Sequence, residues 1–150
     1  MKDIPFQRKG GKSNTEIGKS FENEVKDIFE KKLNISLIHH IPVKIGINEK
    51  KIHKFDLGNP DEKILIECKS HKWTEGGNIP SAKITTWDQA MFYFFIAPKD
   101  FRKIFCILKD CNSKNETLAQ YYIRTRDHLI PTDVEIWEFD DTTQELKRLK

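Results

Sequence analysis

The sequence predicts an α/β domain with a mixed central β-sheet flanked by helices. Three observations predict this class: a long amphipathic segment near the N-terminus, short apolar runs of strand length separated by turn signals, and a second helical segment between two of those runs. The 150 residues are enough for one domain, and three Trp, three Tyr and ten Phe can supply its core. We expect residues 1–14 to form a basic flexible arm and residues 15–150 to form the single domain.

The first helix is predicted over residues 15–33, because apolar side chains recur there at helical spacing. They are Ile17, Phe21, Val25, Ile28, Phe29 and Leu33. Two glutamates, Glu22 and Glu30, are expected on the solvated face of this helix. Glu24 lies on the edge of the apolar stripe, one turn from Phe21 and from Ile28, so that its carboxylate is expected to need a partner.

Strands are predicted over 36–43, 54–58 and 64–69, and the sequence Gly58-Asn59-Pro60-Asp61 is a turn that would join the second and third as a hairpin. A second helix follows, in which Ile84, Trp87 and Met91 share one face. The order ends with a strand over 101–109, a helix over 117–129 and a strand over 134–139.

Charged residues stand at the end of the third predicted strand, which is otherwise apolar. Side chains alternate across a strand, so Glu67 and Lys69 point to one side and Cys68 to the other. The hairpin would bring Asp56 of the second strand close to Glu67. Buried charges are costly unless they are paired or bind a metal, so the sequence predicts two carboxylates and one lysine in a single site.

That combination of side chains suits phosphodiester hydrolysis. Carboxylates are hard oxygen ligands for Mg²⁺ or Mn²⁺, and such an ion can hold a phosphate and lower the pKa of water. A neighbouring lysine can orient or deprotonate the attacking water and stabilise negative charge. The alternative is a half-exposed hairpin that carries an ordinary Glu–Lys surface pair.

These residues resemble the PD-(D/E)XK nuclease superfamily, whose fold is restriction-endonuclease-like. Asp56 matches the first acid of the motif, Glu67 the second and Lys69 the lysine, although Phe55 stands where the family's nominal proline would be. The predicted order of helix, three meandering strands, helix and strand is that of the nuclease core. The resemblance covers roughly residues 15–110 and implies a catalytic glutamate on the first helix, for which Glu24 is the candidate.

The resemblance implies further site residues. The backbone carbonyl of Cys68 would complete the metal ligands, and Gln89 resembles a glutamine that some of these families carry near the metal. The segment Thr86-Trp87-Asp88-Gln89 is also a capping-box pattern, in which Gln89 would have only a structural role.

Two segments are candidates for contact with DNA. One is the basic arm with Arg8, Lys9 and Lys12, and the other is the loop after the catalytic strand with Lys72 and Trp73. A solubilising tail and a loop that only shields the strand end are the alternatives.

Other residues carry no clear chemical pattern. Cys68, Cys106 and Cys111 lack ligand spacing, and the first two are expected in the core. The histidines, including His53, have no partner spacing and are taken as structural. There is no signal peptide and no apolar run of membrane-spanning length, so we expect a cytoplasmic protein without membrane contact.

The function expected from the resemblance is a Mg²⁺- or Mn²⁺-dependent DNA endonuclease of the restriction type, acting as a homodimer. A Holliday-junction resolvase or a DNA-repair nuclease of the same superfamily is the close alternative. A catalytically silent nucleic-acid-binding module is an alternative from a different class.

Overall fold

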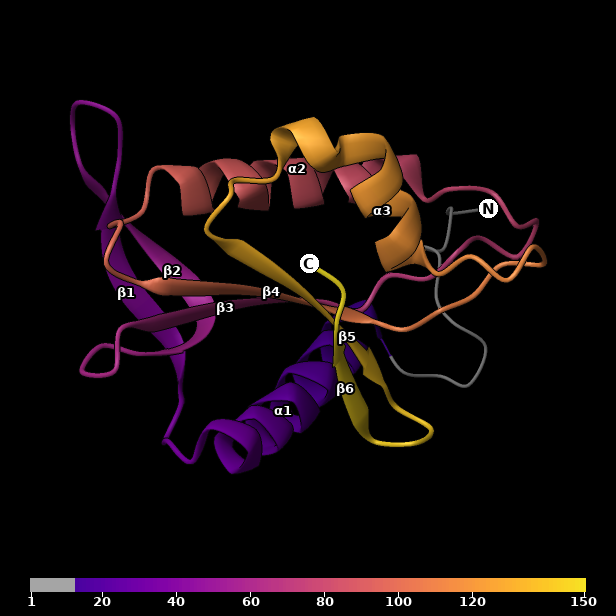
Figure 1. Ribbon diagram of the computed structural model, residues 1–150, viewed down its shortest axis with the longest axis horizontal. Coiled ribbons are helices and arrows are strands. Elements are labelled where there is room, and N and C mark those ends of the chain that lie inside the picture. Colours follow the sequence, from indigo (N-terminus) through magenta and orange to yellow (C-terminus); the bar gives the residue numbers. More distant parts are fainter. Residues whose placement is uncertain (1–12) are drawn as a thin grey trace, which may run out of the picture.

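The computed structural model describes residues 13–150, in which one continuous six-stranded sheet separates helix α1 from helices α2 and α3 (Figure 1). The strands lie in the order β1-β2-β3-β4-β5-β6. The first three pair antiparallel, β3, β4 and β5 are parallel, and β6 is antiparallel to β5. The predicted α/β class with a mixed sheet is therefore confirmed.

The elements in chain order are α1 Asn14–Leu33, β1 Ile38–Ile45, β2 Lys51–Asn59, β3 Ile64–Lys69, α2 Ser81–Phe95, β4 Arg102–Leu108, α3 Leu118–Arg126, a 3₁₀ turn Asp127–Leu129, β5 Val134–Asp140 and β6 Glu145–Arg148.

Helix α1 begins and ends where its capping residues place it. The Ser13 side chain accepts a hydrogen bond from the Glu16 backbone N–H, and the Glu16 side chain accepts one from the Ser13 backbone N–H, which is a complete capping box. The helix stops at Asn34, whose φ of 53° is left-handed. Its buried face, Phe21, Val25 and Phe29, packs on the sheet with Leu57, Ile66 and Trp137 among others.

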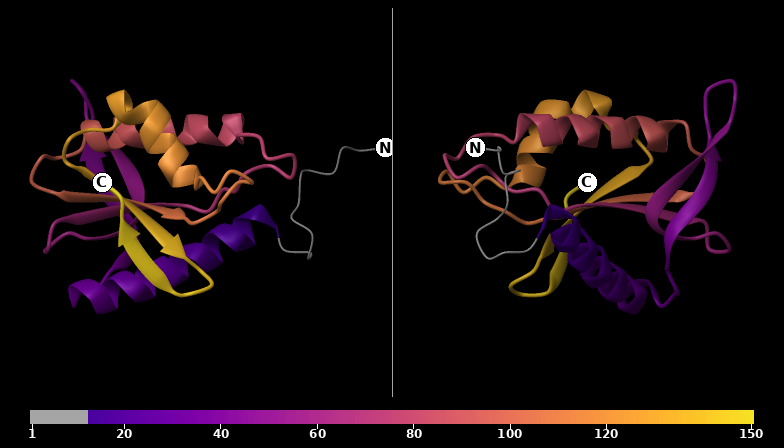
Figure 2. Two further views of the ribbon diagram at one scale, coloured as in Figure 1. Left: turned by 45° about the vertical axis from the view of Figure 1, so that its right-hand side comes forward. Right: turned by 180° about the vertical axis from the view of Figure 1, so that it is seen from behind.

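The opposite face of the sheet is covered by α2 and α3 (Figures 1 and 2). Both helices lie on crossovers between neighbouring parallel strands, α2 between β3 and β4 and α3 between β4 and β5. Because the strand order advances in one direction, right-handed crossovers place both helices on the same face. Trp87, Phe94 and Tyr122 are fully buried there against Phe105.

The hairpin of β2 and β3 forms as predicted, with a different turn. Strand β2 continues through Gly58 to Asn59, and the Asn59 side chain accepts hydrogen bonds from the backbone N–H groups of Asp61 and Glu62. Gly58 is required at its position, because a Cβ there would lie 2.4 Å from the Ile64 carbonyl oxygen.

Some predicted boundaries and one predicted role differ from the structure. Strand β1 starts two residues later than predicted and reaches Ile45, and β6 is an additional strand that the sequence did not indicate. The capping-box interpretation of Thr86 and Gln89 is wrong, because α2 begins at Ser81 and Thr86 lies inside it, with its hydroxyl donating to the Lys83 carbonyl.

Within residues 13–150 no helix is both long enough and apolar enough to span a bilayer.

Candidate active site

Strands β2 and β3 stop pairing at one point, and the candidate site lies in the fork between them. Their ladder runs from Asn59 and Ile64 to Leu57 and Ile66, and no further. Strand β3 then continues beside β4 as far as Lys69. On β1, His40 stands opposite the fork with a left-handed φ of 55°, and within residues 13–150 it has no ladder partner. The side chains at the fork must therefore satisfy backbone groups that the sheet leaves unpaired.

The side chains of Asp56 and Glu67 fill this fork. A carboxylate oxygen of Asp56 (Oδ2) accepts a hydrogen bond of 2.8 Å from the Cys68 backbone N–H. In return, Oε1 of Glu67 accepts one of 3.3 Å from the Asp56 backbone N–H. Each carboxylate thus replaces a missing ladder bond of the other strand. The predicted meeting of Asp56 and Glu67 is confirmed.

The alternation of side chains along β2 is interrupted at the same place. Phe55 packs in the core beneath α2, whereas Leu57 packs in the core beneath α1. In a regular strand two residues that are two apart point to the same side. The break directs the Asp56 side chain into the fork, as an irregular position in a strand can.

Burial gives the Asp56 carboxyl an unusual electrostatic state. Burial raises the pKa of Asp56 to about 8, and the neighbouring Glu67 carboxylate is the second cause of the increase. The hydrogen bond from the Cys68 N–H and the charge of Lys69 oppose it. Glu67 is itself only 8% exposed. Two carboxylates in a poorly solvated fork are favourable to a bound cation, because positive charge would offset both desolvation and mutual repulsion.

Lys69 lies close enough to the acids on either side of the fork to lower the pKa of Asp56 and of Glu22. It is half-buried at the end of β3, two residues after Glu67, so the two side chains project from the same side of the strand. Lys69 is therefore near the two carboxylates, although within residues 13–150 it forms no ion pair with either of them, and its role stays a prediction.

The helix glutamate that approaches the fork is Glu22. Its side chain is only 20% exposed, and burial together with the Glu67 charge raises its pKa, against the opposing effect of His40. The expectation that Glu22 faces solvent is wrong. Glu24 instead lines a shallow surface hollow with Ser20, Ser70 and Lys72, at the far side of the stripe. Glu30, also expected in solvent, accepts hydrogen bonds from the Leu37 backbone and Lys26.

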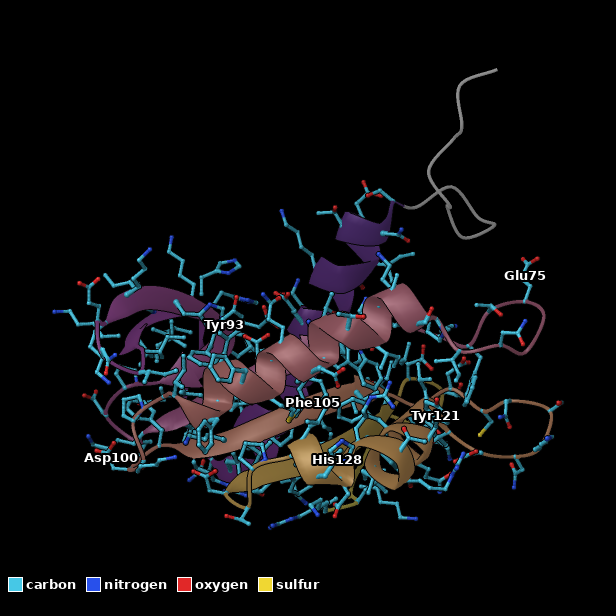
Figure 3. All side chains as sticks on the ribbon, turned by 90° about the horizontal axis from the view of Figure 1, so that it is seen from above. Glu75, Tyr93, Asp100, Phe105, Tyr121 and His128 are labelled. Carbon is cyan, nitrogen blue, oxygen red and sulfur yellow. The ribbon has the colours of Figure 1, made fainter. Side chains whose placement is uncertain are left out.

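His53 is a site residue that the sequence did not reveal. Its Nε2 atom lies 3.8 Å from Oε1 of Glu67, is buried, and has no hydrogen-bond partner in the part of the chain that the structure describes. The ring packs at a tilt of 33° against Tyr93 of α2, with centroids 4.2 Å apart. Figure 3 shows Tyr93 on the side of α2 next to the β1–β2 hairpin. The spacing of His53, three residues before Asp56 on one strand, was the only signal available.

Gln89 lies one helical turn before Tyr93 and is exposed. It therefore shares the side of α2 from which Tyr93 contacts His53. A role of Gln89 in chemistry stays a prediction.

The loop after β3 divides into an anchored and an exposed part. Trp73 donates from its backbone N–H to the Asp110 carboxylate at 2.8 Å and from its indole to the Asp110 carbonyl at 3.0 Å, and it packs edge-on against Tyr121. Both of its donors are thus used within the protein, as expected for a loop that shields the strand end. Lys72 is exposed. Arg8, Lys9 and Lys12 lie outside the described residues.

The donor set fits a hard cation with few protein ligands. Within residues 13–150 no group of three or more His, Cys, Asp or Glu side chains is arranged to hold a metal ion. The two carboxylates in the fork are nevertheless the kind of pair that holds Mg²⁺, which retains several waters and uses substrate phosphate as a ligand. The three cysteines are free, and Cys106 is buried as expected.

Comparison of this chain with models of known protein families, with curated proteins and with solved structures finds no significant match.

Proposed function

We propose that this protein is a metal-dependent DNA endonuclease of the PD-(D/E)XK type, with a restriction-endonuclease-like core. The observation that carries the proposal is the fork in which Asp56 and Glu67 exchange hydrogen bonds across diverging strands beside Lys69. The order α1, β1, β2, β3, α2, β4 supports it, because it is the element order of that nuclease core.

The residues of the fork have separable roles in this proposal. Asp56 and Glu67, with the Cys68 backbone carbonyl, would hold Mg²⁺ or Mn²⁺. The ion would supply positive charge to the scissile phosphate and acidity to the attacking water. Lys69 would orient that water and would either accept its proton as a neutral amine or, as an ammonium, stabilise the negative charge that develops on the phosphate.

Glu22 and His53 position the acids rather than hold the cation. Glu22 adds a third carboxyl group at the α1 side of the fork, which favours a cation there. The His53 ring packs against Tyr93, and its buried Nε2 atom lies 3.8 Å from the Glu67 carboxylate. A hydrogen bond from His53 to Glu67 would fix the orientation of Glu67 as a metal ligand. Gln89 acts at the rim of the same fork.

The substrate and assembly follow from the same reasoning. One chain carries one fork, so cutting both strands of a duplex calls for two copies, and we propose a homodimer. Restriction-type cleavage is the first choice, and the close alternative is a junction-resolving or repair nuclease.

The direct test is incubation of the purified protein with supercoiled, linear, branched and single-stranded DNA, with and without Mg²⁺ or Mn²⁺. We expect metal-dependent cleavage of duplex DNA. Preferential cutting of the branched substrate would identify the junction-resolving alternative, and binding without cleavage of any substrate would identify a silent module.

A matched pair of variants distinguishes the two helix glutamates. We expect Glu22→Gln to lower Mn²⁺ affinity and turnover by about tenfold or more, as for other groups that act through a metal ligand, and Glu24→Gln to change both by less than about twofold. Calorimetric titration with Mn²⁺ and a cleavage assay measure the two quantities. A larger loss in Glu24→Gln would restore Glu24 as the helix residue of the site.

A further inference from the structure

The β1–β2 hairpin extends beyond the rest of the sheet (Figures 1 and 2). One side of it is buried: Ile41, Val43, Ile45 and Phe55 pack beneath α2. The other side is exposed and leads along β2 to Asp56. We propose that this exposed side binds the backbone of duplex DNA next to the fork, with the hairpin tip in the major groove.

The register of the hairpin places two lysines on that side. Lys44 is opposite Ile52, and Pro42 is opposite Lys54, and all four side chains are exposed. Residues that are directly opposite in a ladder share a face. Lys54 precedes Asp56 by two residues, or about 7 Å of strand, and the Lys44–Ile52 pair lies about 7 Å further out. Over such a length one DNA strand presents several phosphates.

Charge on the hairpin is unbalanced. Among residues 13–150, Lys44, Lys51 and Lys54 form no ion pair, and all three are exposed. Glu49 is the exposed acid of the hairpin turn. The surface beside two buried carboxylates is thus positive. A polyanion directed to the fork would be attracted by the hairpin and would bring a phosphate to the acids.

Exposed apolar side chains on the same hairpin favour insertion into a DNA groove over exposure to water. Ile47 at the tip is 73% exposed and Ile52 is 63% exposed, the two highest values among the large apolar residues that the structure describes. A two-stranded ribbon has the width of the DNA major groove, and apolar side chains there can contact thymine methyl groups. A ribbon that carries both lysines and exposed isoleucines is therefore better suited to contact with duplex DNA than to exposure to water.

This inference rests on the proposed function for its substrate, and binding and cleavage test the two separately. The test compares Lys44→Gln/Lys54→Gln with a matched control, Lys114→Gln/Lys147→Gln. The control removes the same charge from exposed lysines that form no ion pair among the described residues. Lys147 lies on β6 at the opposite edge of the sheet, and Lys114 lies between β4 and α3.

Binding of a fluorescent duplex would be measured over a salt series in Ca²⁺, which blocks cutting. We expect the hairpin variant to bind about tenfold or more weakly near 0.1 M salt. The slope of log affinity against log salt should fall by about two, one unit for each phosphate that a lysine no longer neutralises, and the control slope should stay near the unsubstituted value. Ile47→Ser, tested on the same duplex, should weaken binding without changing the slope.

Equal slopes for the hairpin variant and the control would overturn the inference. So would an equal weakening of binding to a single-stranded RNA competitor, because that would indicate a general polyanion surface. If the hairpin dependence is present and the unsubstituted protein cuts no DNA with Mg²⁺ or Mn²⁺, the inference stands and the nuclease proposal fails. Metal-dependent cleavage without hairpin dependence gives the reverse result.

Discussion

Asp56→Asn and Glu67→Gln are each expected to abolish cleavage and to weaken Mn²⁺ binding strongly. Each substitution removes one of two anionic ligands and leaves a side chain of nearly the same shape. The hydrogen bonds across the fork can partly persist, since the amide oxygen introduced by Asp56→Asn can still accept from the Cys68 N–H. Calorimetric titration with Mn²⁺ and a plasmid-nicking assay measure the two effects.

Asp61→Asn is the matched control for these variants. Asp61 is an exposed carboxylate at the turn of the same hairpin, far along the strands from the fork. This variant should bind Mn²⁺ and cut DNA as the unsubstituted protein does. Unchanged Mn²⁺ affinity in both fork variants would contradict the assignment of the ligands.

Asp56→Asn should also stabilise the metal-free protein in a pH-dependent way. The pKa of Asp56 is raised from 3.8 to about 8 on folding, so between these values the folded state holds a proton that the unfolded state has released. The stability contributed by this group is therefore complete below about pH 4 and falls as pH rises toward 8. In EDTA, Asp56→Asn should melt higher than the unsubstituted protein at pH 8, with the difference vanishing near pH 4.

The second large effect is expected for Lys69→Ala. Loss of one acid–base or electrostatic group typically lowers turnover by about a hundredfold or more. Metal affinity should stay within severalfold, because Lys69 is not a ligand in the proposal. Cleavage at saturating Mn²⁺, together with calorimetric titration, separates turnover from binding.

Lys69→Arg and Lys63→Ala complete that experiment. Arginine keeps the charge but does not release a proton, so partial recovery would point to electrostatic stabilisation and none to proton transfer. Lys63 lies at the other end of β3 in an exposed ion pair with Asp100, and its removal should change little. Near-normal turnover of Lys69→Ala would show that Lys69 has no part in the chemical step.

The local pattern of the sequence determined the elements and their faces. Apolar spacing located α1 to within one residue, and the β-branched run located β3 at both ends. Turn residues joined β2 to β3, and this hairpin alone was enough to bring Asp56 to Glu67. These are short-range consequences of side-chain periodicity and turn chemistry, so they are readable without a tertiary structure.

The position of the helix glutamate was decided only by packing. Glu22 and Glu24 flank the buried stripe of α1 on opposite sides, Glu22 with Val25 and Phe29, Glu24 with Phe21 and Ile28. Which edge meets the fork depends on how α1 is rotated and tilted over β2 and β3. Periodicity identifies a face and leaves that orientation open, so the sequence could not show that Glu22 rather than Glu24 lies nearer to Glu67.

The interruption of β2 and the contact between His53 and Glu67 also depend on the tertiary structure. A regular strand would place Phe55 and Leu57 on one side, whereas here, where β2 separates from β3, they enter opposite cores. His53 acquires its place beside Glu67 because Tyr93, far along the chain on α2, packs over its ring. The sequence by itself determined which acids and which lysine share a hairpin, because that depends on neighbours along the chain. The surroundings that bury and charge them come from elements distant in sequence, and only the folded chain brings those together.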